Sequence, residues 1–335
     1  MTDTKSNTPE KDKVQYVAIS PDMFQAQNND DEIDLRELWN VIWRGKWLII
    51  AITTIFAVAS VFYALSLPNI YKSEALLAPA DSDQQGGLSG LSGQLGGLAS
   101  LAGVNLGGGK TDKTALAIEI LKSREFFAKF AEKHNILPDL MAADGWNLAT
   151  NSVVYDKDIY SSETGEWVRE VKAPKRSKPS MQESQVKFNE TFLVEKNVDT
   201  GMINISIEHY SPFVAKLWVE WLVEDINLEM KIRDKEEAER SINYLQTQIA
   251  KTNNVEQKSL LYQLIEEQAK TLMFAEVRNE YVFKTIDPAL VSEIKSKPNR
   301  ALIVFSIVFL GGLLGTIYIL VSNQLSPLKD RKDKI

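Results

Sequence analysis

The amino-acid sequence predicts an α+β protein, in which a membrane-proximal α/β base domain carries a long, extended α-helical hairpin and is flanked by two transmembrane helices. The membrane helices are predicted because the 38 Lys and Arg and the 45 Asp and Glu residues all lie outside Trp47–Tyr71 and Ala301–Leu328. Each stretch exceeds the roughly 20 apolar residues that cross a bilayer. The hairpin is predicted by a helical apolar pattern that starts at Phe213 and continues for about 40 residues.

The two charge-free stretches divide the chain into five segments. They are a cytoplasmic N-terminal segment (1–46), a first transmembrane helix (47–67), an extracytoplasmic domain (68–300), a second transmembrane helix (301–322) and a cytoplasmic tail (323–335). The first span follows 46 mostly polar residues with an acidic balance. It is therefore predicted to be an uncleaved anchor rather than a signal peptide, whose apolar core follows a short basic start.

The distribution of basic residues predicts the orientation. Arg36, Arg44 and Lys46 precede the first span, and the last residues of the chain include Lys329, Arg331, Lys332 and Lys334. Because cytoplasmic flanks are enriched in Lys and Arg, both termini are predicted to be cytoplasmic. Basic residues just before the second span point the other way, but a connecting segment of 229 residues translocates largely regardless of its charge.

Two side-chain patterns lie at and within the spans. Trp39, Trp43 and Trp47 recur every four residues, which predicts three indoles on one helical face as a membrane-interface belt. A short amphipathic helix packed on protein is the alternative. In the second span Gly311, Gly312 and Gly315 place small residues on one face, a pattern typical of transmembrane packing with close helix approach.

The first part of the extracytoplasmic domain is predicted to be a strand followed by a glycine-rich loop. Residues 70–79 read as a strand, and residues 86–109 hold 10 of the 17 glycines, interleaved with leucines. Such a stretch is predicted to be a mobile loop, with a partly ordered or membrane-surface segment as the alternative. Gly107–Thr111 resembles the end of a phosphate-binding loop, but that pattern needs glycine where Val104 stands, so nucleotide binding is not expected.

Helical periodicity over residues 113–134 predicts one helix that ends before Pro138. His134 lies at the C-terminal end of this helix, where a cation is favourable, so a structural role is expected. Residues 150–185 are rich in turn-forming residues and include a basic group, Lys172, Lys175, Arg176 and Lys178. This group is predicted to be a solvated loop, and contact with an anionic lipid-linked substrate is the alternative.

The helical hairpin is predicted over residues of about 213–283, directly after a β-hairpin with glycine in its turn. Ser211 and Pro212 are typical of a helix start. An apolar seam with coiled-coil spacing follows: Ala238, Ile242, Leu245 and Ile249. Thr252–Asn254 breaks the helix, and a returning helix is predicted to run to about Phe283. Because so long a helix cannot bury its seam alone, neighbouring copies are expected to share it.

The residues that carry catalysis and metal binding are scarce. The chain has no cysteine, two histidines far apart in sequence, and a net charge of -7 without a basic stripe, which argues against thiolate chemistry, metal sites and nucleic-acid binding. The acidic pairs Glu236/Glu237 and Glu266/Glu267 are adjacent on helices, so each pair points to different faces. No catalytic, cofactor-binding or metal-ligating set is predicted, and the chain is not expected to be an enzyme.

Three segments in order resemble one family. They are Ile33–Trp47 before the first span, Asn197–Pro212 leading into a long helix with Trp218 and Asn227, and Asp287–Arg300 before a glycine-containing span. The last includes Pro288, Pro298 and Arg300, a second-span entry motif, although its proline series is sparse. Residues 30–325 resemble the Wzz-type polysaccharide co-polymerases, the O-antigen chain length determinants.

The resemblance implies a two-span protein of the bacterial inner membrane that sets the modal length of a surface polysaccharide, most readily lipopolysaccharide O-antigen. It implies a homo-oligomeric ring that acts without catalysis on a growing lipid-linked polysaccharide, together with a Wzy-type polymerase. The glycine-rich stretch resembles exopolysaccharide relatives, so the alternative is a membrane adaptor for capsule or exopolysaccharide polymerisation or export. That adaptor would work with a separate tyrosine kinase, because only seven residues follow Leu328. A sensor and a membrane-bound hydrolase are more distant alternatives, lacking an output module and catalytic residues.

Overall fold

The computed structural model describes residues 35–80 and 112–329. The predictions for the remaining residues, including the mobile loop at 86–109 and the phosphate-loop look-alike at 107–111, lie outside the described residues. The chain divides into two compact units. One joins Met1–Ser60 with Val304–Ile335 and is called the membrane unit here, and the other, Val61–Ile303, is called the body.

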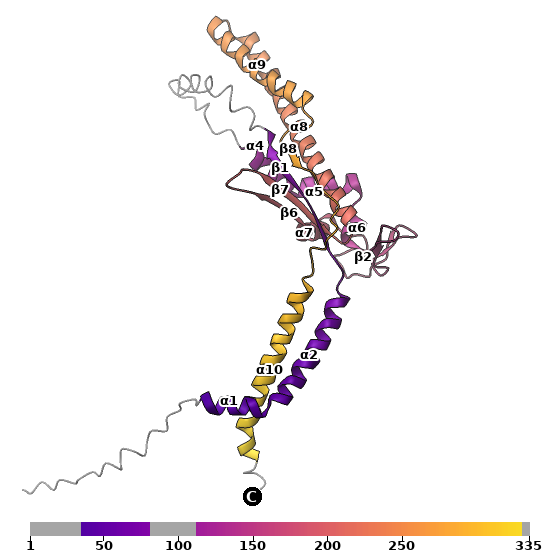
Figure 1. Cartoon of the computed structure of the whole chain (residues 1–335). Coiled ribbons are helices and arrows are strands. Elements are labelled where there is room, and N and C mark those ends of the chain that lie inside the picture. Colours follow the sequence, from indigo (N-terminus) through magenta and orange to yellow (C-terminus); the bar gives the residue numbers. More distant parts are fainter. Residues whose placement is uncertain (1–34, 81–111, 330–335) are drawn as a thin grey trace, which may run out of the picture. The chain divides into compact units, whose positions relative to one another are not determined.

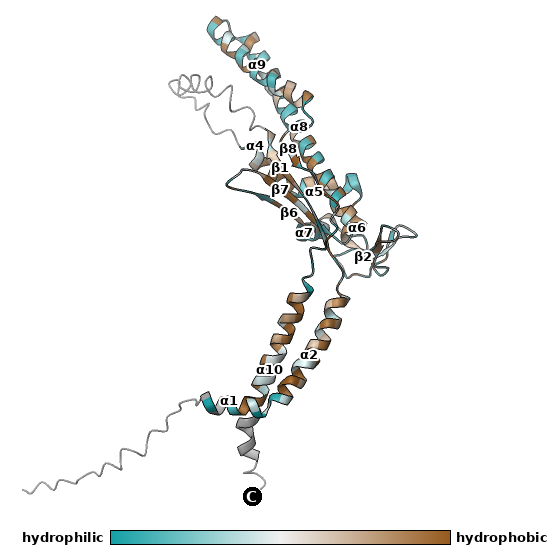
Figure 2. Ribbon diagram, in the orientation of Figure 1, coloured by the Kyte–Doolittle hydropathy of each residue, from teal (hydrophilic) through white to brown (hydrophobic). Residues whose placement is uncertain are grey.

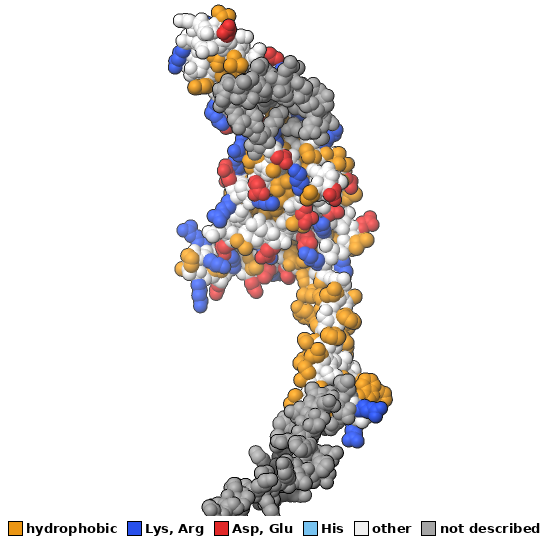
Figure 3. Space-filling view, turned by 90° about the vertical axis from the view of Figure 1, so that its left-hand side faces the viewer, with side chains coloured by type: hydrophobic (Ala, Val, Ile, Leu, Met, Phe, Trp, Pro, Cys, Tyr) orange, Lys and Arg blue, Asp and Glu red, His pale blue; other side chains and the backbone are white. Residues whose placement is uncertain are grey.

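The two predicted spans are confirmed as helices long and apolar enough to cross a membrane. Helix α2 is Lys46–Ser66, and the apolar part of α10 (Arg300–Lys329) is Arg300–Ser322, each with a mean hydropathy of 2.4. Only 11% of each stretch is buried within the chain, so neither is the core helix of a soluble protein. Brown, apolar residues dominate both helices, and hydrophobic side chains cover their visible surface (Figures 2 and 3). The chain is therefore membrane-anchored.

A short helix precedes the first span and differs from the prediction. Helix α1 is Leu35–Arg44, and the chain turns at Gly45 before α2 begins, so α1 runs across the direction of α2 (Figure 1). Trp39 and Trp43 lie on α1, whereas Trp47 lies on α2. The prediction of one helical face for all three indoles is wrong, because glycine at the junction interrupts the helix.

Four strands of the body form an antiparallel sheet in the order β6-β7-β1-β8. Their bounds are Phe192–Lys196 for β6, Ile203–His209 for β7, Tyr71–Pro79 for β1 and Phe283–Asp287 for β8. The predicted strand at 70–79 and the predicted β6–β7 hairpin are confirmed, and Gly201 adopts a φ of +70° in the hairpin turn. Strands from the two ends of the body, β1 and β8, lie next to each other.

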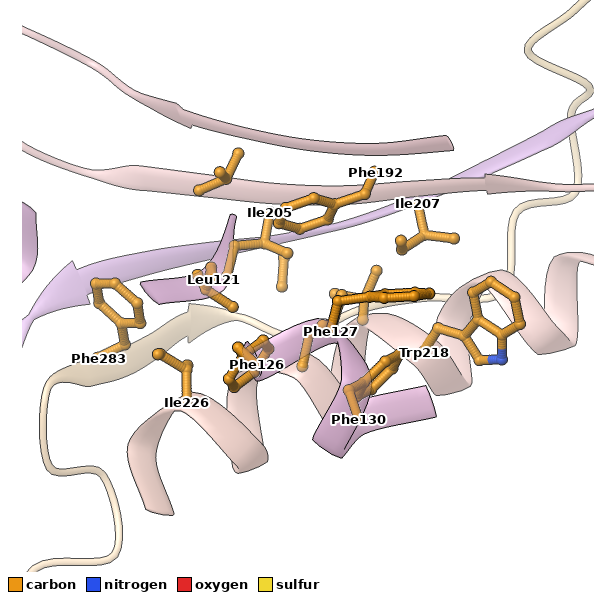
Figure 4. Packing of buried hydrophobic residues seen from close by; sticks show 14 of the residues in the cluster. Leu121, Phe126, Phe127, Phe130, Phe192, Ile205, Ile207, Trp218, Ile226 and Phe283 are labelled. Atoms are coloured by element: carbon orange, nitrogen blue, oxygen red, sulfur yellow. The ribbon is translucent and has the colours of Figure 1, made fainter. Parts of the chain in front are cut away.

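Helices cover one face of this sheet and form the core with it. They are α4 (Lys113–Leu121), α5 (Arg124–His134), α7 (Met181–Thr191) and the first part of α8 (Pro212–Lys251). Aromatic side chains of α5 and α8 point towards the isoleucines of β7, as Figure 4 shows for Phe127 and Trp218 against Ile205 and Ile207. All four of these side chains are buried. The α/β base is thus a two-layer unit whose stability comes from apolar burial.

The predicted helical hairpin is confirmed as two antiparallel helices, α8 and α9 (Val255–Val277). The Ser211 side chain caps α8, whose 40 residues correspond to ~60 Å of helix. Ala238 on α8 and Ala275 on α9 are both buried, whereas the rest of the predicted seam is half-buried. The returning helix ends at Val277 instead of about Phe283, because Phe283 starts strand β8.

One further expectation is corrected and another is extended. Residues 113–134 form α4 and α5 instead of one helix, because Ser123 caps the second helix, and Pro138 lies at the start of a new helix, α6 (Leu137–Met141). Residues 150–185 contain turns as predicted, together with the start of α7 and three short strands, Ser152–Tyr155 (β3), Tyr160–Ser161 (β4) and Glu166–Trp167 (β5). Strand β3 pairs with Ala143–Asn147 (β2), which precedes this segment, and β4 pairs with β5.

Candidate functional site

The glycines of the second span lie against the first span of the same chain. A Cβ atom at Gly311 would lie 2.7 Å from Phe56 Cβ, and one at Gly315 would lie 3.4 Å from Ile49 Cα. Gly312 has more room, since its nearest neighbour would be Thr53 Oγ1 at 3.7 Å. The close approach predicted from the glycine spacing is therefore made between α10 and α2, and Gly311 is the position where a side chain has no space.

The tryptophans before the first span have large exposed surfaces. Trp39, Trp43 and Trp47 are 63%, 58% and 75% exposed. Trp39 stacks on Trp43 with ring centroids 6.1 Å apart, and the Lys46 ammonium lies 4.6 Å from the centre of the Trp43 ring. Exposed indoles next to a cationic side chain are typical of the headgroup region of a membrane, and their place there remains a prediction.

Arg300 joins the beginning of the second span to the end of the first. Its Nη2 donates to the Leu67 carbonyl at 3.1 Å and to Asn69 Oδ1 at 3.2 Å. Because the last carbonyls of a helix lack intrahelical partners, the guanidinium caps α2. Residues Ile70 and Lys297 pair beside it, with Ile70 N–H donating to the Lys297 carbonyl at 3.0 Å. Of the predicted entry motif, Pro288 directly follows β8 and Pro298 lies between this pairing and Arg300.

Asn227 holds the chain that returns from the hairpin. Its Oδ1 accepts from the N–H groups of Val282 and Phe283 at 2.8 and 3.0 Å. Its Nδ2 donates to the Phe283 carbonyl at 3.1 Å and to the Val223 carbonyl at 3.0 Å. A single buried side chain thus fixes the point at which the chain leaves the hairpin and enters strand β8.

Both histidines take part in structural contacts. His134, at the end of α5 as predicted, lies 2.8 Å from Asp225 Oδ2 on α8 and stacks on Trp221 at 4.1 Å between ring centroids. The Ser211 N–H donates to His209 Nδ1 at 3.0 Å, and His209 Nε2 donates to the Asp139 carbonyl. Burial lowers the pKa of His209, so the ring is neutral at pH 7.

The acidic pairs at Glu236/Glu237 and Glu266/Glu267 lie on solvated helix faces. Glu236 is paired with Arg240 at 3.4 Å and Glu266 with Lys270 at 2.8 Å, each on its own helix. The described residues contain no group of three or more His, Cys, Asp or Glu side chains that could hold a metal ion.

The basic group Lys172, Lys175, Arg176 and Lys178 is exposed, as predicted for a solvated loop, and its backbone is held by residues that the sequence analysis overlooked. The Arg169 guanidinium donates to the carbonyls of Ser177 and Arg176 at 2.7 and 2.9 Å, and to Glu183 Oε2 at 3.0 Å. Glu183 also forms a reciprocal capping box with Ser180 at the start of α7. The Ser-x-x-Glu spacing is a signal that could have located this helix start in the sequence.

Replacing Glu183 with glutamine is expected to lower the melting temperature at neutral pH, with a difference that shrinks in acid. The Arg169 guanidinium and the Ser180 N–H lower the pKa of Glu183 from 4.5 to about 2. A depressed carboxyl pKa stabilises the folded chain above pH 4.5, and this contribution is lost as pH falls from 4.5 towards about 2. Thermal unfolding of both chains across this range measures the effect.

The matched control is Glu190→Gln, which removes an exposed carboxylate from the same helix. This control is expected to change the melting temperature little at any pH. A Glu183→Gln deficit that stays constant between pH 7 and pH 3 would contradict the role of the ionised carboxylate.

Comparison with known proteins finds a family match in the first part of the chain. Residues 31–134 match the family model described as Wzz, chain length determinant protein. A full-length bacterial polysaccharide co-polymerase shares 14% identity at a TM-score of 0.38, with 88% of this chain and 99% of that chain covered. A fragment of WzzB, a polysaccharide co-polymerase from Salmonella Typhimurium, shares 14% identity at a TM-score of 0.27, with 68% and 100% covered. No curated protein matches the chain.

The matched segment contains the first span, strand β1 and the helices α4 and α5 that complete the core of the body. Over this segment the chain is similar to the Wzz chain length determinant family.

Proposed function

We propose that the chain regulates the modal length of a surface polysaccharide, most readily lipopolysaccharide O-antigen, as a non-catalytic co-polymerase. The observation that carries the proposal is the family match over residues 31–134. One apolar helix precedes the body along the chain and another follows it. Both support the proposed function, because they anchor the long helical hairpin to a membrane. The proposed partner is a Wzy-type polymerase that extends a lipid-linked polysaccharide.

The proposed place of the protein is the bacterial inner membrane, with both termini in the cytoplasm and the body in the periplasm. The basic residues before the first span and after the second span support this orientation. The exposed indoles of Trp39, Trp43 and Trp47 would then lie at the cytoplasmic interface. Arg300, which caps the end of α2, would lie at the periplasmic one.

The proposed acting form is a homo-oligomeric ring in which the hairpins of neighbouring copies pack together as coiled coils. Along α8 and α9, large apolar or aromatic side chains remain more than half exposed: Tyr244, Leu260, Tyr262 and Met273. Such residues on two exposed helices favour burial against further helices.

Deletion of the gene is expected to shift the length distribution of the surface polysaccharide without abolishing its synthesis. The reason is that a regulator of chain length contributes no bond-forming step. Silver-stained gels of lipopolysaccharide measure the O-antigen ladder, and capsule is sized separately. An unchanged ladder with an altered capsule would assign the chain to capsule, and unchanged lengths of both polymers would contradict the proposed function.

A further inference from the structure

A pocket of about 580 Å³ opens on the body. One side is formed by the start of α6 and Asn135, which follows α5, and the other by the β4–β5 pair and the loop before α7. Its lining residues are Asn135, Leu137, Pro138, Tyr160, Gly165, Glu166, Trp167, Ser177 and Lys178. The volume lies within the range of roughly 300–1,000 Å³ that is typical of small-ligand sites.

Two aromatic rings contribute to the apolar part of this pocket, together with Leu137 and Pro138. Tyr160 and Trp167 are paired across β4 and β5, with ring centroids 5.1 Å apart. Trp167 packs against the hydrophobic core while remaining partly exposed, so the indole is held in place from behind. Tyr155 supports Tyr160 edge-on at 5.5 Å, and its own hydroxyl donates to Asp139 Oδ1 at 2.5 Å.

Polar side chains surround these rings. Asn135, Glu166 and Lys178 are exposed, and within the described part of the chain none of the three has a side-chain hydrogen bond or ion pair. They offer an amide that donates and accepts, a carboxylate that accepts and an ammonium that donates. The groups that a ligand would bind are therefore not already engaged by the protein.

The rim of the pocket is also pre-organised. Arg169 holds the backbone at Arg176 and Ser177, and Glu183 holds Arg169. This fixes the segment that presents Ser177 and Lys178. A preformed rim lowers the entropy lost when a ligand binds.

We propose that this pocket binds sugar units of the polysaccharide whose length the protein regulates, an inference that rests on the proposed function. A pyranose ring has an apolar face of C–H groups and an edge of hydroxyl groups. The face matches the rings of Tyr160 and Trp167, and the hydroxyls match the free donors and acceptors of Asn135, Glu166 and Lys178.

The test uses the full-length chain in nanodiscs and short oligosaccharides released from the surface polysaccharide of the cell that produces the protein. Saturation-transfer NMR measures binding to the wild type and to four variants. Trp167→Leu is expected to bind about tenfold more weakly through loss of the aromatic plane, whereas Trp167→Phe retains most of the affinity. Lys178→Gln is expected to weaken binding, and its matched control Lys157→Gln, an exposed residue outside the pocket, is expected to leave it unchanged.

Melting temperatures establish that the variants are folded. Lys178 is exposed and does not contribute to the fold, so Lys178→Gln tests ligand binding without destabilising the protein. Absence of binding by the wild type, or equal binding by the wild type and Lys178→Gln, would overturn the inference. If the oligosaccharides do not bind while gene deletion still shifts polymer length, only the pocket is wrong. If deletion leaves polymer length unchanged, the proposed function fails whatever the oligosaccharides do.

Discussion

Replacing Asn227 with leucine is expected to lower the free energy of unfolding by about 3 kcal/mol, because two buried backbone N–H groups and one carbonyl lose their partner. Leucine fills a similar volume but cannot accept from Val282 or Phe283, which are 4% and 0% exposed. In a body of this size the loss corresponds to a fall in melting temperature of roughly 6–12 °C. Thermal unfolding of the full-length chain in detergent measures it.

Asn243→Leu is the matched control, since Asn243 is an exposed residue on the same helix α8. It is expected to change the melting temperature by less than about 2 °C, as for most surface substitutions. Equal shifts for the two variants would show that the returning chain does not depend on the Asn227 side chain.

Replacing Gly311 with leucine is expected to separate the two spans and to change the modal length of the polysaccharide. The added side chain begins where Phe56 Cβ lies only 2.7 Å away, so α10 cannot keep its distance from α2. Gly312→Ala is the control, because a Cβ atom there meets Thr53 Oγ1 at an ordinary 3.7 Å. The double variant Gly311→Leu/Phe56→Ala is expected to recover part of the wild-type length, since removal of the ring provides space.

Cross-linking tests the same contact directly, because the chain has no native cysteine. Cysteines introduced at Thr53 and Gly312 are expected to form a disulfide within one chain and to do so less in the Gly311→Leu background. A disulfide that forms only between chains would instead assign the glycine face to neighbouring copies. Unaltered cross-linking together with an unaltered polysaccharide ladder would show that the glycine spacing has no role.

The features that the sequence predicted well are those with a long uniform pattern. A stretch without charge defines each span, and the helices begin at Lys46 and Arg300, one residue before the predicted starts. The long helix was predicted because its apolar period continues without interruption between a proline start and the polar break at Thr252. In both cases many residues contribute to one signal, so single exceptions do not change the prediction.

The features that the sequence did not predict depend on single residues or on distant partners. Ser123 separates helices α4 and α5. The apolar periodicity nevertheless continues from Leu121 to Phe126, so the sequence pattern shows no interruption at the helix break. The pairing of β1 with β8 joins residues more than 200 positions apart, which local periodicity does not encode. The glycine spacing predicted close helix approach but not that the neighbour is α2 of the same chain.

The candidate pocket shows the same limit. Tyr160 and Trp167 belong to strands of two residues each, too short for an alternating pattern to show. Their meeting with Asn135 and Lys178 depends on the clamp of Arg169, whose partners are mostly backbone carbonyls. Every residue has a backbone carbonyl that can accept a hydrogen bond, so the amino-acid sequence does not indicate which carbonyls the Arg169 side chain binds.

The most direct test of the proposed function is the length distribution and the total amount of surface polysaccharide in the deletion strain, with and without the chain supplied again from a plasmid. A regulator of chain length is expected to restore the modal length while the total amount of sugar stays nearly constant. A distribution that does not respond to the chain would contradict the account, as would a polymer that disappears in its absence, since the chain would then be required for synthesis or export itself.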